Sequence, residues 1–184
     1  MSAASRNNPA TAVPPSLAIL GSARSDGHTA ALLARLTAGL SCETIDLTAA
    51  RLEPFGYAQR YAAGDPFPGI IERMAAAPVA IFATPVYWFS YSAVMKGFID
   101  RFSDLVMTRK ALAPRLRGRS FALLASGSDP ALEPALNLAF SQFCDFFGAC
   151  CIAMIYAREA GPFVDPDAAA LVRREMGEAE AGDR

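Results

Sequence analysis

The sequence predicts an α/β fold in which a five-stranded parallel sheet is covered by helices on both faces. Two observations support this class of fold. Short apolar runs alternate with segments of helical periodicity from Leu17 onward. Three of the runs, at 17–20, 79–83 and 121–125, are almost continuously hydrophobic, which is typical of strands buried on both faces of a parallel sheet. Parallel neighbours need right-handed crossovers, so helices are expected on both sides of the sheet.

The strands are expected to differ in position within the sheet. Five segments are expected to be strands: 17–21, 42–47, 78–84, 119–126 and 149–157. Segment 42–47 alternates between polar and apolar residues, so it is expected at an edge. Pro85 follows the third strand and has no backbone N–H, so the chain is expected to leave the sheet there.

Helical patterns lie between and after these strands. Five segments are expected to be helices: 29–39, 67–76, 92–104, 134–147 and 166–179. Asp165 and Pro166 suit the N-cap and first position of the last helix, and Gly148 suits the end of the fourth. The third helix presents more apolar side chains than one contact with a sheet requires: Val94, Met95, Phe98, Phe102 and Leu105. We therefore expect a homodimer or homotetramer whose symmetric interface buries the remainder.

Length and composition predict one domain over residues 16–184. Residues 1–15 mix Ser, Asn, Ala and Pro and are expected to form a disordered lead without a secretory signal. A net charge of −1 provides no basic surface for nucleic acid, and no apolar run approaches the roughly 18 residues of a membrane span. The expected location is the cytoplasm. The four cysteines lack C-x-x-C spacing, so free thiols are expected rather than a metal site.

A polar loop, residues 21–29 (Gly-Ser-Ala-Arg-Ser-Asp-Gly-His-Thr), joins the first strand to the first helix. Backbone N–H groups at a helix N-terminus lack intrahelical partners, and the helix dipole favours an anion there. Ser22 and Thr29 add hydroxyl groups, and Arg24 adds a guanidinium that suits phosphate oxygens. This pattern indicates a phosphate site, with an ordinary polar turn as the alternative.

The spacing of the loop excludes two well-known phosphate motifs. Five residues separate Gly21 from Gly27 and His28 follows, which does not match the P-loop of nucleoside triphosphatases. The dinucleotide pattern G-x-G-x-x-G is absent because position 23 is Ala. A single terminal phosphomonoester therefore suits the loop better than a pyrophosphate.

Two further loops are expected beside this one. With one phosphate loop and five strands, the order 2-1-3-4-5 is expected, and ligands then bind at the carboxyl ends of strands 1 and 3. Residues 87–89 (Tyr-Trp-Phe) follow the third strand, and such a concentration of rings indicates a flat conjugated ligand or a subunit interface. Residues 126–128 (Ser-Gly-Ser) follow the fourth strand and supply hydroxyls and amides without bulk. FMN combines the phosphate, polyol and planar ring that these loops require.

The loops resemble those of the NADPH-dependent FMN reductase family, which has a flavodoxin-like fold. The first motif is Gly21-Ser22-x-Arg24-x-x-Gly27-x-Thr29, and the second runs from Thr84-Pro85-Val86-Tyr87-Trp88 through Ser92-Ala93-x-Met95-Lys96-x-Phe98-Ile99-Asp100-Arg101. The resemblance covers about residues 17 to 158 and implies a flavodoxin-like three-layer sandwich that binds FMN. It implies cofactor contacts from Ser22, Arg24, Gly27, His28 and Thr29 at the phosphate, from Pro85, Val86, Tyr87, Trp88 and Phe89 along the ring, and from Ser126, Gly127 and Ser128 at its other edge. His28 stands where many relatives have Asn.

The resemblance also implies an activity. NADPH or NADH would transfer hydride to FMN by a ping-pong mechanism, and a small acceptor such as a quinone, an azo compound or a free flavin would then be reduced. The flavin carries this chemistry, so no catalytic side chain and no metal is assigned. Two alternatives stay open: an electron-transfer flavodoxin, whose strongly acidic surface a net charge of −1 does not provide, and a regulatory module of the same fold that binds no flavin.

Overall fold

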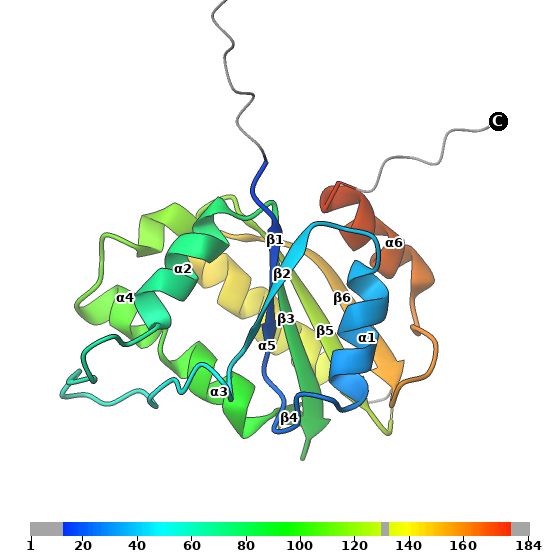
Figure 1. The fold of residues 1–184 in the computed structure, drawn as a ribbon, viewed down its shortest axis with the longest axis horizontal. Coiled ribbons are helices and arrows are strands. Elements are labelled where there is room, and N and C mark those ends of the chain that lie inside the picture. The colour runs from blue at the N-terminus through cyan, green and yellow to red at the C-terminus, as the bar shows by residue number, and fades with distance from the viewer. Residues whose placement is uncertain (1–12, 130–132, 178–184) are drawn as a thin grey trace, which may run out of the picture.

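A parallel sheet forms the centre of the computed structural model, which describes residues 13–129 and 133–177 (Figure 1). The strands within these residues are β1 (Ser16–Leu20), β2 (Cys42–Asp46), β3 (Val79–Tyr87), β4 (Ser90–Tyr91), β5 (Ser120–Gly127) and β6 (Cys150–Arg158). Their order is β2-β1-β3-β5-β6, and β4 pairs with β3 in an antiparallel hairpin. Apart from this short extra strand, the order is the predicted 2-1-3-4-5, with β2 at an edge as expected.

Helices cover both faces of the sheet and make three layers (Figure 1). They are α1 (His28–Thr37), α2 (Phe67–Ala76), α3 (Ala93–Asp100), α4 (Ser103–Met107), the 3₁₀ turn η1 (Ala113–Leu116), α5 (Glu133–Phe147) and α6 (Pro166–Glu175). One hydrophobic core lies between the sheet and α2–α5, and a second lies between the sheet and α1 with α6. The inner strands are buried on both faces, which explains their continuous apolar sequences.

The prediction that Pro85 ends the third strand is wrong. Strand β3 continues to Tyr87, and Pro85 is opposite Ser126 of β5. The pairing of β3 with β1 ends at Ala83, so the missing N–H of Pro85 lies where β3 has become an edge on that side. A proline is tolerated there because no ladder hydrogen bond is lost.

The expected helix at 92–104 is divided into α3 and α4. Ser92 caps α3, its Oγ accepting a hydrogen bond from the backbone N–H of Met95 at 3.0 Å. Met95 and Phe98 of α3 are completely buried, and the neighbouring Phe102 and Leu105 are almost so, within the same chain. The apolar side chains from which an oligomer was predicted are therefore buried in the core of one subunit, and this argument for a dimer is wrong.

A buried guanidinium fastens the long connection between β2 and α2. Arg101 is completely buried and donates to Asp104 at 2.9 Å and to Asp65 at 2.6 and 3.1 Å. It also donates to the carbonyl of Glu53 at 2.9 Å and lies 3.5 Å from the ring centroid of Tyr61. Burial lowers the pKa of Arg101, but the bonds to Asp65 and Asp104 outweigh it and raise this pKa above its usual value. Loss of one partner from such a buried pair costs about 3–5 kcal/mol.

The other expectations concern the N-terminal residues, membrane spans, metal sites, the cysteines and the last helix. Residues 1–12 of the predicted disordered lead lie outside the described residues. No described helix is long and apolar enough to cross a membrane, and no metal-binding cluster occurs among the described residues. All four cysteines are free as expected, but the expected burial holds only for Cys144: Cys42 and Cys151 are partly buried and Cys150 is exposed. The last helix begins at Pro166 with Asp165 as its N-cap, as predicted.

Candidate functional site

The loop after β1 brings hydroxyls and an uncapped helix start to one place. Helix α1 begins after Gly27, and no side chain caps its N-terminus. Thr29 is buried in the first turn, and Ser22 is buried at the start of the loop, where its Oγ accepts a bond from the N–H of Arg24 at 3.3 Å. Arg24 itself is 75% exposed. The backbone N–H groups at the start of α1 are thus available to an anion.

The start of this loop is fixed by helix α3. The carbonyl of Gly21 accepts a hydrogen bond from the Ser92 hydroxyl at 2.5 Å. A Cβ atom at Gly21 would lie 2.6 Å from the Cβ of Met95 and 2.9 Å from its Cα. Only glycine allows this close approach, so the loop and the N-terminus of α3 are held together. The two motifs singled out in the sequence therefore meet in space.

The carboxyl end of β5 supplies the second side of the site. The hydroxyls of Thr29 and Ser126 lie 2.6 Å apart and are buried, which links α1 to β5. Gly127 follows, and a Cβ atom there would lie 2.4 Å from the hydroxyl of Tyr156 on β6. That hydroxyl donates to the carbonyl of Asp129 at 2.8 Å. Tyr156 thus packs against the backbone of this loop at Gly127 and holds it through a hydrogen bond at Asp129.

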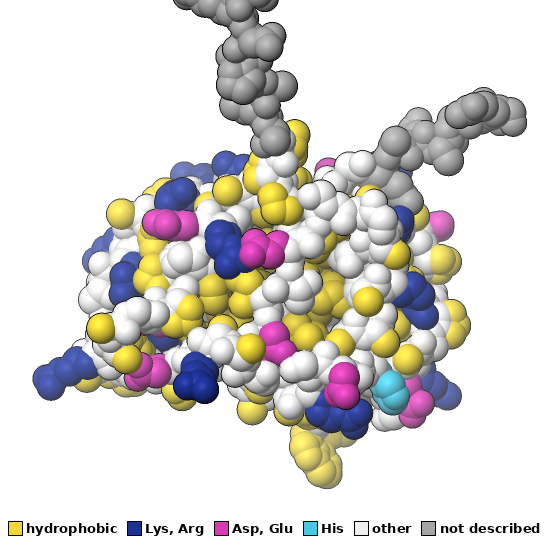
Figure 2. All heavy atoms as spheres, in the orientation of Figure 1, with side chains coloured by type: hydrophobic (Ala, Val, Ile, Leu, Met, Phe, Trp, Pro, Cys, Tyr) yellow, Lys and Arg dark blue, Asp and Glu magenta, His cyan; other side chains and the backbone are white. Residues whose placement is uncertain are grey.

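The hairpin β3–β4 forms the third side. Val86 pairs with Tyr91 and Tyr87 with Ser90, so only Trp88 and Phe89 remain in the turn. Both turn residues have positive φ, 48° and 67°, as a type I′ turn requires. Their side chains are 92% and 65% exposed. Figure 2 shows hydrophobic side chains projecting from the surface at the position of this hairpin.

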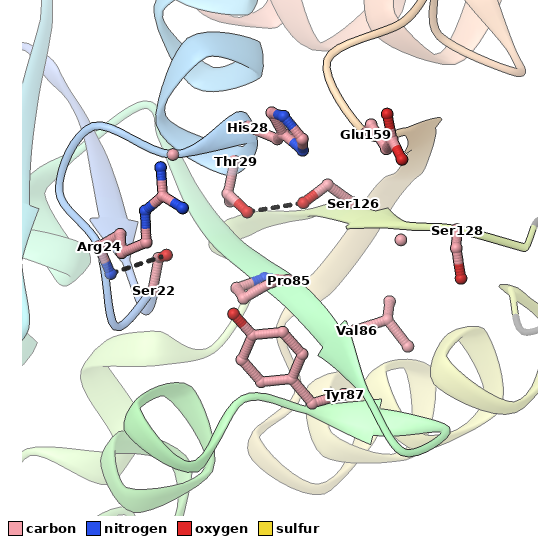
Figure 3. A pocket seen from close by; sticks show the side chains of 12 residues that line it. Ser22, Arg24, His28, Thr29, Pro85, Val86, Tyr87, Ser126, Ser128 and Glu159 are labelled. Carbon is pink, nitrogen blue, oxygen red and sulfur yellow. Dashed lines mark hydrogen bonds between the residues drawn. The ribbon is translucent and has the colours of Figure 1, made fainter.

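The three sides enclose one open pocket of about 300 Å³. Eleven of the thirteen predicted cofactor residues line it: Ser22, Arg24, Gly27, His28, Thr29, Pro85, Val86, Tyr87, Ser126, Gly127 and Ser128. Figure 3 shows Ser22 and Arg24 on one side, Ser126 and Ser128 along β5, and Pro85 to Tyr87 along β3. Trp88 and Phe89 are not among the lining residues, since the turn directs them outward. Small-molecule sites usually measure about 300–1,000 Å³.

Glu159 also lines the pocket, and the sequence analysis did not identify it. It follows β6 directly, and the strand order places the end of β6 beside that of β5. No motif marks this residue. The only available signal was its place two residues after the expected strand 149–157, at the edge of the sheet where the other site loops lie.

Two acidic residues lie at the loop between β1 and α1, and only Asp46 fastens it. Asp26 lies 3.8 Å from the guanidinium of Arg24, and both side chains are largely exposed. Asp46, at the end of β2, accepts a bond from the Ser25 hydroxyl at 2.5 Å and bonds from Thr48 at 2.6 and 2.8 Å. Partial burial raises the pKa of Asp46, but the bonds from Ser25 and Thr48 outweigh it, so the pKa is lowered. The ionised carboxylate therefore fastens the loop to β2.

The fold and the position of the loop define a flavodoxin-like α/β protein. The chain is similar to the Trp repressor binding protein from Bacillus subtilis, with a TM-score of 0.65 and 26% identity over 86% of this chain and 98% of that one. A flavodoxin, WrbA-like protein from Agrobacterium tumefaciens has the same fold, with a TM-score of 0.59 and 15% identity over 88% of this chain and 95% of that one.

Sequence comparison identifies the family within this class. The profile of the NADPH-dependent FMN reductase family matches residues 15–162, and the chain belongs to this family. A Bacillus subtilis protein, provisionally named an NAD(P)H-dependent FMN-containing oxidoreductase, is 37% identical over 91 residues. That alignment covers 47% of this chain and spans about half the length of the curated relative.

Proposed function

We propose that the protein is an FMN-dependent NAD(P)H oxidoreductase that reduces a small acceptor. The observation that carries this proposal is the uncapped N-terminus of α1, which opens into the same pocket as the apolar surface of β3 and the small residues after β5. A helix N-terminus suited to a phosphate and a surface suited to a flat ring thus lie within one pocket. Family membership supports the same cofactor.

The residues present fit the phosphate of FMN. The buried hydroxyls of Ser22 and Thr29 and the backbone N–H groups at the start of α1 supply neutral donors. Arg24 supplies a mobile charge, because its guanidinium is exposed and its contact with Asp26 is long. We expect His28 to contribute its backbone N–H, with its imidazole toward solvent. These donors would hold one phosphate without a lysine or a metal.

The residues at the other end fit the flavin ring. Pro85, Val86 and Tyr87 present a partly apolar wall, and the backbone of 126–128 presents polar groups close to it. Gly127 adds no side chain to this loop, and its backbone packs closely on Tyr156 and Val86. When bound, FMN would supply the two-electron transfer between the nicotinamide and the acceptor. The protein would position the reactants and keep the loops in place.

The open pocket supports a ping-pong mechanism in which the nicotinamide and the acceptor use one site in turn. NADPH or NADH would be the donor, and a quinone, an azo compound or a free flavin would be the acceptor. Among the described residues, the Thr29 and Ser126 hydroxyls bond to each other and neither bonds to a histidine or carboxylate. Protein nucleophilic catalysis is therefore not part of the proposal.

We also propose a homodimer or homotetramer, now on different grounds. Trp88 and Phe89 form an exposed aromatic tip beside the pocket, and such a tip is typical of an interaction site.

Four free cysteines are consistent with a reducing compartment, so we propose action in the cytoplasm. Residues 16–184 would form one domain. The two alternatives, an electron carrier or a module without flavin, make opposite predictions in the experiment below.

The experiment is titration of the purified apoprotein with FMN, followed by steady-state oxidation of NADPH and of NADH with a quinone acceptor. The proposal predicts stoichiometric FMN binding and catalytic nicotinamide oxidation that requires FMN. A carrier would bind FMN but would not oxidise either nicotinamide. A module without flavin would bind no FMN.

A further inference from the structure

Glu159 is the one carboxylate among the residues that line the pocket in the described part of the chain. In Figure 3 its side chain lies across from Ser22 and Arg24, on the side of the pocket where His28 and Ser126 are found. It therefore faces the space between the phosphate loop and the loop after β5. The rest of the pocket suits an anion, so the presence of a carboxylate there requires an explanation.

The backbone of Glu159 is in a conformation that side chains avoid. Its φ is +51°, in the left-handed region that is uncommon for residues other than glycine. The N–H of Glu159 donates to the carbonyl of Gly127 at 3.0 Å, which ties the residue to the loop after β5. Strained residues of this kind persist only where the surroundings hold them, and they concentrate at functional sites.

Helix α1 holds the turn that carries Glu159. Arg35 donates to the carbonyls of Ala160 at 3.3 Å and Gly161 at 2.6 Å, and its guanidinium lies 4.3 Å from the ring centroid of Phe163. The N–H of Gly161 donates to the carbonyl of Arg158 at 2.8 Å, closing the turn. The N-terminus of α1 also contributes to the proposed phosphate site. One helix therefore positions both that site and the turn that carries Glu159.

The carboxylate of Glu159 has no hydrogen-bond or ion-pair partner among the residues that the structure describes. An ionised carboxylate only accepts hydrogen bonds, and it repels a phosphate. Glu159 is exposed, so a ligand that displaces water from this carboxylate has to supply a neutral donor, separated from the phosphate. In FMN the groups between the phosphate and the ring are the hydroxyls of the ribityl chain.

We propose that Glu159 accepts a hydrogen bond from a ribityl hydroxyl of the flavin and so selects for a ligand with a polyol between phosphate and ring. This inference rests on the proposed function. It adds a positioning residue that belongs to neither sequence motif, held in a strained conformation for this contact.

The test uses three ligands that differ in the relevant groups: FMN, riboflavin without the phosphate, and lumiflavin without the ribityl chain. Each is titrated into the wild-type apoprotein and the variants Glu159→Gln and Glu159→Gly, with flavin fluorescence as the readout. Gln retains a neutral acceptor, so affinity should fall about threefold, because charge-assisted bonds are roughly twice as strong as neutral ones. Gly removes the acceptor while suiting the backbone, so affinity should fall about tenfold.

The proposal predicts equal losses for FMN and riboflavin and no loss for lumiflavin. Tighter FMN binding by Glu159→Gln, with riboflavin unchanged, would mean that Glu159 acts on the phosphate, and would overturn it. Equal effects on all three ligands, or none, would also overturn it. Asp26→Asn is the matched control, because it removes a carboxylate near Arg24 outside the pocket lining and should leave riboflavin affinity unchanged. A wild-type protein that binds none of the three ligands would instead refute the proposed function on which the inference rests.

Discussion

Arg24 stands in solvent at the mouth of the pocket, and its ion pair with Asp26 is long and exposed. An exposed pair of this kind contributes little to stability, so the guanidinium is free to turn toward a ligand. The phosphate of FMN would give it a charge-assisted partner. Its contribution should therefore appear in binding and not in folding.

Replacement of Arg24 by Ala should weaken FMN binding about tenfold, since bonds to charged groups contribute about 1.5–3 kcal/mol. Riboflavin has no phosphate, so its affinity should not change, and neither should the urea midpoint. Arg119→Ala, at the opposite end of β5 from the pocket, is the matched control. Equal weakening of FMN and riboflavin would contradict a phosphate contact for Arg24.

Of the pocket lining, the sequence predicted the residues of the polar loop fully and those of the other segments in part. Ser22 and Thr29 were identified because a hydroxyl-rich segment between a strand and a helix has a direct physical meaning. Glu159 was missed because no motif marks it, and its one signal is its place just after the last strand. Trp88 was expected along the ring, yet the two-residue turn places it 92% exposed and outside the pocket lining.

The loop after β5 depends on a fit between two elements. Gly127 lies directly over the hydroxyl of Tyr156, at a distance that no Cβ atom tolerates. Tyr156 cannot move aside easily, because it is almost completely buried and bonds to the carbonyl of Asp129. The need for glycine here comes from packing, and not from a positive φ.

Gly127→Ala should destabilise the protein by about 1–3 kcal/mol through overpacking. Tyr156→Phe removes the obstructing hydroxyl and should by itself cost about 1 kcal/mol for the lost hydrogen bond. The double variant should be more stable than the sum of the two losses predicts, with a coupling of about 0.5–3 kcal/mol. Urea denaturation of all four proteins measures this coupling. Strictly additive losses would show that the Tyr156 hydroxyl does not determine the choice of glycine.

Asp46 connects strand β2 to the phosphate loop through an ionised carboxylate. Its folded pKa is lowered below the unfolded value of about 3.9. The carboxylate therefore stabilises the fold above that pH, and the contribution is lost as the pH falls through the folded pKa. Asp46→Asn should be less stable than the wild type at pH 7, and the gap should close in acid. Urea midpoints at both pH values provide the test, and a gap that persists unchanged in acid would contradict it.

Sequence patterns predicted the elements because burial on both faces of a strand leaves a continuous apolar run. The hairpin β3–β4 was missed, since Pro85 normally marks the end of a central strand. Strand β3 tolerates Pro85 because β1 stops pairing with β3 before this residue, and that is a property of the assembled sheet. The third predicted helix is divided at Arg101 and Phe102, where backbone N–H groups bond to carbonyls three residues back, and no residue pattern shows this.

Across the whole molecule, the aromatic tip of the hairpin is the most exposed apolar feature next to the pocket. Trp88 and Phe89 adopt positive φ, which suits Asn and Gly better than aromatic residues. Because an unfavourable conformation is combined with exposure, we propose that the rings contact a partner. A second copy of the chain is the partner that we propose.

Replacement of Trp88 by Asn together with Phe89 by Gly should keep or improve the turn while removing the rings. In sedimentation velocity, the wild type should sediment as a dimer or tetramer and the double variant as a smaller species. Leu138→Gln, an exposed apolar position on α5, is the control and should not change the mass. A wild-type protein that is monomeric at every concentration would refute the oligomer.

We propose that the pocket at the carboxyl ends of β1, β3 and β5 makes this protein an FMN-dependent NAD(P)H oxidoreductase. The most direct test is anaerobic stopped-flow mixing of the FMN-loaded protein with NADPH and with NADH, followed through the visible absorbance of oxidised flavin. We expect rapid, complete bleaching by at least one nicotinamide and its reversal when a quinone is added. A flavin that stays oxidised with both nicotinamides would contradict this function.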